Sequence, residues 1–251
     1  AAVDDALATW PTLRTTPSGA RVHSGFARGG TGVRSMLWVQ EFDAVDGTCA
    51  GGGGGGGELR SRLGELLGPI AAAARHAAGW DHTFAGAAAL CMPAARPELV
   101  RWNFDAPPLA RREILYLLAS SELRGGGALY AYPSVSDAWA RDHAGVQPSG
   151  GAADGGGRRV RAANLYPSCD VLTPLPDGRW RLAHLITTRL GGWVPDVADS
   201  HLLARSLVGV YANEAEALRR YALKPGAADA ADAGESAAQT RYAEPDGLCD
   251  Q

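Results

Sequence analysis

The sequence contains little of several features that would point directly to a function. Lysine is nearly absent, since Lys224 is the only lysine among 24 basic residues, and the formal net charge is −3. A chain without excess positive charge has no strong field for nucleic acid or for an anionic membrane. The cysteines are few and far apart, with no Cys-x-x-Cys pair, which argues against a zinc site and against a disulfide framework. They are Cys49, Cys91, Cys169 and Cys249.

Long apolar runs are missing as well. No window approaches the ~18 uninterrupted apolar residues of a transmembrane helix, so a soluble protein is expected. Reduced cysteines fit a cytoplasmic location, with at most peripheral contact at a membrane. The chain begins Ala-Ala-Val-Asp-Asp, without an initiator Met or a charged-then-apolar signal segment, as an excised domain or a processed product would.

Catalytic and metal-binding motifs are also absent. The histidines show no His-Glu-x-x-His spacing, and no serine lies in a Gly-x-Ser-x-Gly elbow. The seven consecutive glycines at 51–57 are not followed by the Lys-Ser/Thr of a phosphate-binding loop. His184 lies among Leu182, Leu185 and Ile186, a setting that favours a core histidine satisfied by a neighbour. We therefore expect no metal, no cofactor and no enzymatic activity.

What the sequence does contain is a series of short β-type segments that ends in a long helix. Apolar runs between Gly, Pro and Asp clusters predict strands at 20–27, 33–42, 84–92, 98–105, 129–132, 159–166, 169–174 and 179–188. Helices are predicted at 4–10, 58–78, 136–143 and 195–221, with a candidate helix cap in Ser134-x-Ser136-Asp137. Segment 109–119 is predicted to begin as a helix and to end as a strand. Glycine-rich insertions are expected near 50–57 and 147–157, and a disordered tail over 226–251.

The most informative segment joins the last strand to the last helix. The strand ends before Gly191-Gly192, and the helix begins after Trp193 and Val194, with Pro195 in its first turn, where proline is tolerated. A helix with an apolar stripe must bury that stripe against a surface already formed, so we expect it to cover one face of a curved sheet. The stripe consists of Val194, Val197, Leu203, Leu207, Val210, Tyr211, Leu218 and Tyr221.

Four stretches of the sequence resemble one known family when they are taken in order. They are Gly79-Trp80-Asp81, the segment from Pro107-Pro108-Leu109 to Tyr116, Val160-Arg161-Ala162 followed by Pro167-Ser168-Cys169, and Gly191-Gly192-Trp193-Val194-Pro195. Together they resemble a START domain, the lipid-transfer module related to steroidogenic acute regulatory protein. The likeness covers roughly 10–221. This sequence departs from the family pattern in its two glycine-rich insertions, in Arg189-Leu190, where an acidic residue is common, and in Arg112-Glu113, which replaces an Arg-Asp pair.

The resemblance implies an α+β helix-grip fold, in which a curved antiparallel sheet wraps around the long C-terminal helix and leaves an internal apolar cavity. We expect a single START-like domain over 1–225 that binds one hydrophobic lipid, such as a sterol or a phospholipid, for intracellular lipid transfer or sensing. Such a domain would act as a monomer, touch a membrane surface only transiently, and bind no nucleic acid. Two other functions stay open: an enzyme on a related helix-grip scaffold that acts on a hydrophobic substrate, and a regulatory ligand-binding module of a larger protein.

The candidate lipid-binding residues are large apolar or aromatic side chains of the expected strands and of the last helix. Those in the helix are also explained by ordinary core packing, and Trp193 is either a packing residue at the helix start or a gate that contacts a membrane. Arg112 and Glu113 form either an exposed pair worth little or a charge at the tunnel mouth, with Arg112 as the head-group candidate. The cavity candidates are Trp38, Phe42, Trp102, Phe104, Tyr116, Tyr130, Leu185, Trp193, Val197, Leu203, Leu207 and Val210.

Overall fold

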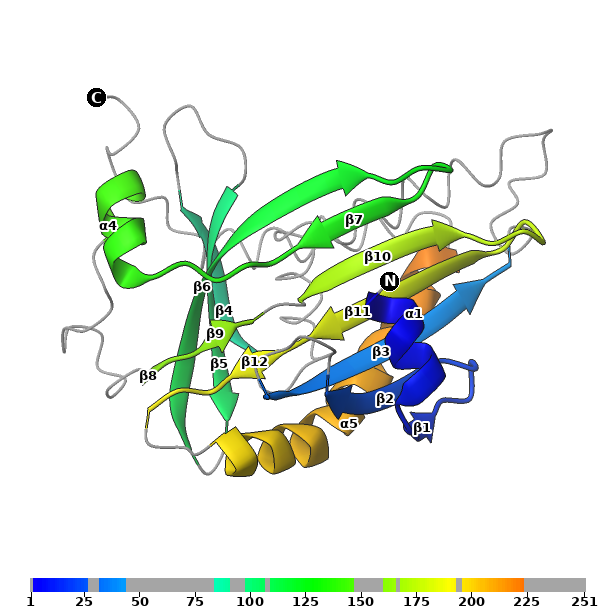
Figure 1. Cartoon of the computed structure of the whole chain (residues 1–251), viewed down its shortest axis with the longest axis horizontal. Helices are drawn as coiled ribbons and strands as arrows, with labels where there is room; N and C mark the ends of the chain where they lie inside the picture. The colour runs from blue at the N-terminus through cyan, green and yellow to red at the C-terminus, as the bar shows by residue number, and fades with distance from the viewer. Residues whose placement is uncertain are drawn as a thin grey trace.

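The structure is a computed structural model that describes residues 2–26, 32–43, 84–90, 98–106, 109–146, 160–165, 168–192 and 196–223. The helices in these residues are α1 (Ala2–Thr9), α4 (Asp137–Ala144) and α5 (Asp196–Leu223), as Figure 1 shows. The strands are β1 (Thr12–Thr15), β2 (Arg21–Phe26), β3 (Arg34–Phe42), β4 (Phe84–Leu90), β5 (Glu98–Ala106), β6 (Leu109–Glu122), β7 (Ala128–Ala131), β8 (Val160–Arg161), β9 (Ala163–Asn164), β10 (Cys169–Pro174), β11 (Trp180–Ile186) and β12 (Thr188–Arg189).

One large sheet organises these elements. Its strands follow the order β1-β2-β3-β11-β10-β7-β6-β5-β4 with antiparallel neighbours, and β8 pairs in parallel with β6 off this path. β9 and β12 form a separate two-stranded sheet. In Figure 1, β4 and β5 run steeply across the direction of β3 and β11, so the sheet is strongly curved. The strand β11 lies in the middle of the sheet, between β3 and β10. The helix α5 comes after β11 and β12 in the chain and lies across this middle part of the sheet.

The two faces of the sheet are identified by its register. Trp38 pairs with His184, and His184 pairs with Asp170, so these three side chains share one face. The alternate residues Leu37 and Leu185 also pair with each other, and they point to the opposite face. We call the first the α5 face and the second the α1 face, after the helices that cover them.

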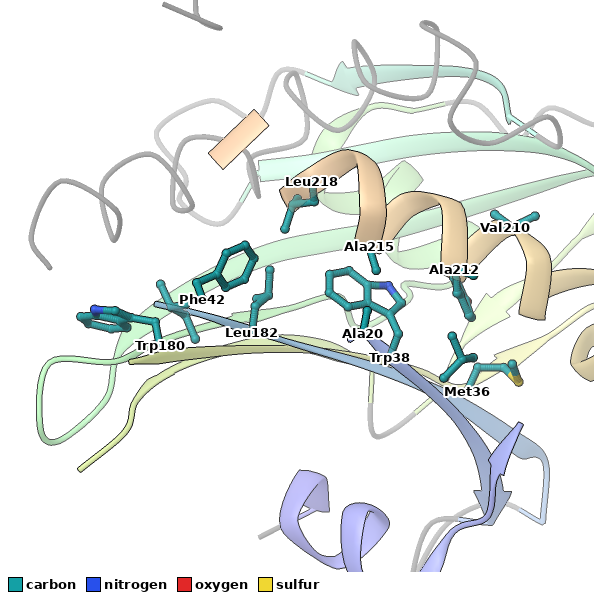
Figure 2. Close-up of a cluster of buried hydrophobic side chains, with 13 residues drawn as sticks. Ala20, Met36, Trp38, Phe42, Trp180, Leu182, Val210, Ala212, Ala215 and Leu218 are labelled. Atoms are coloured by element: carbon teal, nitrogen blue, oxygen red, sulfur yellow. The ribbon is translucent and has the colours of Figure 1, made fainter. Parts of the chain in front are cut away.

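The α5 face holds the largest apolar cluster, where the stripe of α5 meets the middle strands. Figure 2 shows Ala212 and Ala215 of α5 directed at Met36 and Trp38 on the sheet, and Leu218 directed toward Phe42 and Leu182. Full burial of a Leu or Val side chain contributes about 1.5–3 kcal/mol, so this stripe is a main source of the helix's attachment. The buried residues of the cluster are Ala20, Val22, Met36, Trp38, Phe42, Leu172, Trp180, Leu182, Val210, Tyr211, Ala212, Ala215 and Leu218.

Two short helices cover the other face. Val3, Ala6 and Trp10 of the α1 region pack on Leu37 and Leu185, among others. Ala140 of α4 packs on Leu99 and Leu115, at the end of the sheet that contains β4 to β6. The predicted helix cap is confirmed, and Ser136 is the serine that supplies it, because its side chain accepts a hydrogen bond from the Trp139 backbone N–H at 3.1 Å.

Most of the predicted elements in the described residues are confirmed, and two predictions are wrong. Segment 109–119 is strand throughout in β6, because Ile114 and Leu115 are both buried, one on each face of the sheet. Segment 159–166 is not one strand but contains the short strands β8 and β9. β1 was not predicted, since its four residues are exposed and show no apolar alternation. The predicted helix at 58–78, both glycine-rich insertions and the predicted tail lie outside the described residues.

The link from β12 toward α5 depends on two glycines. Gly191 and Gly192 have φ angles of +69° and +73°, a region that other residues rarely adopt. A Cβ on Gly191 would lie 2.1 Å from the carbonyl oxygen of Arg161 in β8. The backbone of this link therefore touches the backbone of β8, which sets where the chain leaves the sheet before α5.

Candidate functional site

The candidate site begins where α5 crosses the α5 face. Trp38, Phe42 and Val210 are each at most 2% exposed and belong to one cluster, against which Tyr130 and Leu207 pack. The structure thus brings together five of the predicted residues, contributed by β3, β7 and α5.

A second cluster continues the same face toward β5. Tyr116 is buried with Ile114 and Val100, and the half-buried Trp102 and Phe104 pack against them. Tyr130 packs against both clusters. The apolar and aromatic surface of the α5 face is therefore continuous from β3 to β5.

Four of the predicted cavity residues are not part of this surface as described. Leu185 was placed wrongly, because it packs with Val3 and Trp10 on the α1 face and alternates with His184 along β11. Trp193 lies outside the described residues, and the structure does not describe the side chains of two predicted residues in α5. Those two are Val197 and Leu203.

The charged pair of β6 is buried, so its interpretation as an exposed surface pair is wrong. Arg112 is 2% exposed and Glu113 is 1% exposed. Consecutive strand residues point to opposite faces, which places Arg112 on the α5 face with Ile114 and Tyr116. Arginine keeps its charge in proteins. Arg112 therefore sets a positive charge within the apolar surface of the candidate site.

Glu113 joins a separate ion network on the opposite face. It accepts a hydrogen bond from Arg161, and its other oxygen lies 3.5 Å from Nε of Arg101. Arg161 also lies 2.5 Å from Asp137, the first residue of α4. Buried ions need partners of this kind because desolvation penalises an isolated charge. The network thus ties β8, β6 and α4 together and has a structural role.

A polar group lies within the apolar α5 face. Nδ1 of His184 lies 2.5 Å from a carboxylate oxygen of Asp170, and the Tyr132 hydroxyl donates to the other oxygen. The indole N–H of Trp38 donates to Glu214 of α5 at 3.3 Å. The prediction of a core histidine satisfied by a neighbour is confirmed. In the described part of the chain, no three His, Cys, Asp or Glu side chains are grouped so as to hold a metal ion.

Sequence reasoning did not single out Asp170, Tyr132 or Glu214 as members of this group. One signal was available for Asp170. Asp170 lies two residues before Leu172 in a predicted strand, and residues two apart in a strand point to the same face. Its carboxylate is therefore expected on the face that buries Leu172. Tyr132 and Glu214 reach the group only through the pairing of distant segments.

The described helices give no membrane span, since none of them is both long and apolar enough to cross a bilayer.

Solved structures share this arrangement of sheet and helices. The human StarD13 (DLC2) lipid transfer and protein localization domain aligns with 86% of this chain and 89% of its own, at 19% identity and a TM-score of 0.55. Human StAR-related lipid transfer protein 5 aligns over 85% and 88%, at 16% identity and a TM-score of 0.53. The STAR-related lipid transfer protein from Xanthomonas axonopodis aligns over 86% and 99%, at 16% identity and a TM-score of 0.53. The fold is that of the START domains. No protein-family model matches the sequence, and no curated protein does.

The START-like fold confirms the predicted helix-grip class, a large curved antiparallel sheet with a long C-terminal helix across one face. Three of the four stretches that carry the resemblance meet in space. Arg112 and Glu113 of β6 pair with Val160 and Arg161 of β8, and Gly191 lies against the Arg161 carbonyl. These stretches therefore form the junction from which α5 is directed over the START-like sheet.

Proposed function

We propose that this chain binds one hydrophobic lipid between the sheet and α5, and that it transfers or senses this lipid inside the cell. The observation that carries the proposal is the continuous apolar and aromatic α5 face, crossed by a long helix in a START-like fold. The similar structures are named as lipid transfer proteins or domains. A lipid chain requires an apolar surface of this kind, with few polar groups.

The driving force in this proposal is burial of the lipid's apolar surface. Each buried methylene contributes about 0.8 kcal/mol, so a chain of about twenty carbons contributes ~16 kcal/mol and offsets a cost of association of ~4–15 kcal/mol. Binding of this type requires no metal, no nucleotide and no catalytic step. We take 1–225 as one domain that acts as a monomer in the cytoplasm and touches a membrane only while it loads or releases lipid.

Hydrogen bonds attach the C-terminal half of α5 to the sheet. Near its C-terminal end, Glu216 accepts a hydrogen bond from the Ser18 backbone N–H, and Arg219 donates to the Ser18 carbonyl, both at 2.9 Å. Trp38 donates to Glu214 in the same half of the helix. These contacts hold that half on β3 and on the β1–β2 turn. An opening for the lipid is therefore not expected at this half of the helix.

Arg112 is the head-group candidate of this proposal. Its guanidinium is buried on the face that carries the apolar clusters, and guanidinium groups bind phosphate and carboxylate groups well. An anionic lipid head group matches the charge at this position. The variant Arg112→Gln should then retain less phosphatidylglycerol relative to phosphatidylcholine than the wild type does.

The test is lipid uptake from vesicles, with two tryptophan variants that differ in the face they alter. Wild-type protein is incubated with mixed phospholipid and sterol vesicles, isolated again and examined by native mass spectrometry. We expect one lipid per chain. Trp102 and Trp139 are both half-buried, but Trp102 lies on the α5 face and Trp139 packs in the α4 cluster. Trp102→Ala should lower lipid retention several-fold, and Trp139→Ala should leave it unchanged. Folded wild-type protein without lipid, or equal losses in both variants, would contradict the proposal.

A further inference from the structure

The N-terminal helix α1 is held on the sheet by a few apolar side chains. Val3, Ala6 and Trp10 are buried, and they pack on a part of the α1 face that includes Leu37 and Leu185. The helix has eight residues, and an isolated helix of that length is not stable in water. α1 is therefore helical only while these contacts hold it against the sheet.

Trp10, which follows α1 directly, packs on a glycine of β2. A Cβ on Gly25 would lie 2.4 Å from Cγ of Trp10, so the indole ring lies directly on the backbone of this strand. The backbone N–H of Trp10 donates to the Ala6 carbonyl at 2.8 Å and so continues the last turn of α1. A side chain larger than that of glycine at position 25 would displace the ring and α1 with it.

His23 lies beneath the same link between α1 and β1. It precedes Gly25 by two residues in β2, so both positions face the link. Its Nδ1 lies 3.4 Å from the Trp10 carbonyl oxygen and 3.3 Å from the Thr12 hydroxyl. Because a carbonyl only accepts, Nδ1 carries the proton of the neutral ring, and Nε2 is an acceptor. His23 is 3% exposed, and Nε2 is buried without a hydrogen-bond partner among the described residues.

The surroundings of His23 do not stabilise a positive charge. Within the described residues, no carboxylate pairs with this ring. Burial is the main reason why the pKa of His23 is lowered, and the like charge of Arg21 adds to it. A proton on Nε2 therefore costs free energy for as long as the link covers the ring. The charged residues of the elements around His23 are Asp4 and Asp5 on α1, Arg14 on β1, Arg21 on β2, and Arg34 and Glu41 on β3.

We propose that residues 2–10 form an acid-released cover of the sheet: protonation of His23 favours an open state in which α1 and Trp10 leave the α1 face while α5 stays bound. In the open state the charged ring reaches water, and the apolar surface around Leu37 and Leu185 becomes exposed. α5 packs on the opposite face of the same strands, behind β3 in Figure 1. Histidines that become charged near pH 6 control interfaces in this way. The inference is independent of the proposed lipid binding.

The direction of the pH dependence follows from the two states. In the open state His23 is in water and titrates near about pH 6.5, whereas in the covered state its pKa is lower. The open population should therefore rise as the pH falls through about 6.5, and stop rising below the pKa of the covered state. Between pH 7.5 and pH 5.5 the increase is at most about tenfold, since one proton is involved.

The experiment is hydrogen–deuterium exchange of the whole chain at pH 7.5 and at pH 5.5, followed by peptide mass spectrometry. The rates are corrected for the pH dependence of exchange in an unfolded chain, so that the protection of each peptide can be compared. In the wild type, protection in 2–12 should fall several-fold at pH 5.5, up to about tenfold. Protection in 206–220 of α5 should change much less.

Three variants assign the response to His23 and to the link. His23→Gln is neutral at both pH values, so 2–12 should keep its protection at pH 5.5. His143→Gln is the matched control, because His143 lies on α4 and is exposed, and it should respond as the wild type does. Gly25→Ala should expose 2–12 at both pH values, since its Cβ displaces Trp10, and should leave α5 protected.

Several outcomes would overturn the cover. One is a wild type in which 2–12 is unprotected at pH 7.5, or equally protected at both pH values. Another is an equal loss in 2–12 and in α5, which would show general destabilisation by acid. A full wild-type response in His23→Gln would place the titrating group elsewhere. The wild-type comparison decides the matter even if a variant does not fold, and it holds whether or not the chain takes up lipid.

Discussion

Replacing Gly191 by alanine tests the junction from which α5 is directed over the sheet. Alanine at a φ of +69° is strained by about 1–2 kcal/mol, because Cβ approaches the backbone in the left-handed region. In addition, the new Cβ would lie 2.1 Å from the carbonyl oxygen of Arg161, whereas ordinary contacts begin near 3.4 Å. One of the two backbones has to move by more than about 1 Å, which is a change of the kind that costs about 1–3 kcal/mol.

Movement of β8 away from this clash is restricted by its own contacts. Arg161 is paired with the buried Glu113 and with Asp137, and the Ala162 backbone N–H donates to the Glu113 carbonyl at 2.8 Å. The two penalties should therefore add to a loss of about 2–5 kcal/mol in the free energy of unfolding. For a chain of this size, that corresponds to a fall in Tm of roughly 4–20 °C.

Gly19→Ala is the matched control. Gly19 has a φ of +85°, but no atom lies within 4 Å of the position of its Cβ, so only the conformational strain of about 1–2 kcal/mol is expected. The assay is urea unfolding of both variants and the wild type, followed by circular dichroism. Equal losses of stability in Gly191→Ala and Gly19→Ala would refute the close approach of the link to β8.

Three further predictions concern other parts of the fold. Burial lowers the pKa of His23, whose Nε2 has no partner within the described residues. The folded state therefore disfavours protonation of His23, and the free energy of unfolding should fall as the pH drops below about 6.5. In urea unfolding at several pH values, His23→Gln should show a weaker dependence of the unfolding free energy on pH than the wild type does. Leu218→Ala should lower the unfolding free energy by about 2–5 kcal/mol, because Leu218 is fully buried between α5 and the sheet, and a change below about 1 kcal/mol would contradict the described packing. Burial, with Asp170 beside it, raises the pKa of the Cys169 thiol to about 12, so peptide mapping after iodoacetamide treatment at pH 8 should find Cys169 modified only when urea is present.

The parts of the fold that could be predicted are those whose signal is local. The segments before and after Gly191-Gly192 combine a strand pattern, a turn that requires glycine and a helical stripe, and all three are as expected. The strand character of 109–119 is a different case. Its residues fit a helix or a strand almost equally well, and the pairing of β6 with β5 and β7 decides between them. Such pairing between distant segments leaves little signal in the segment itself.

The candidate site shows the same division. Trp38, Phe42 and Val210 follow from their size and spacing, because large apolar residues on a buried face are recognisable from the sequence. Leu185 has the same apolar character, yet it faces α1, since a shift of one residue along a strand reverses the face. The pair of Asp170 and His184 is invisible in the sequence, because fourteen residues separate two side chains that only the β10–β11 hairpin brings together.

Photolabelling with a lipid that carries a diazirine on its acyl chain tests most directly whether the ligand lies between the sheet and α5. The lipid is loaded from vesicles, activated by light, and its attachment sites are mapped by peptide mass spectrometry. Our account predicts labels in 196–223 of α5 and in the strands 34–42 and 180–186, which α5 covers. Labels confined to α1 and α4, on the opposite face, or a folded protein that carries no label, would contradict it.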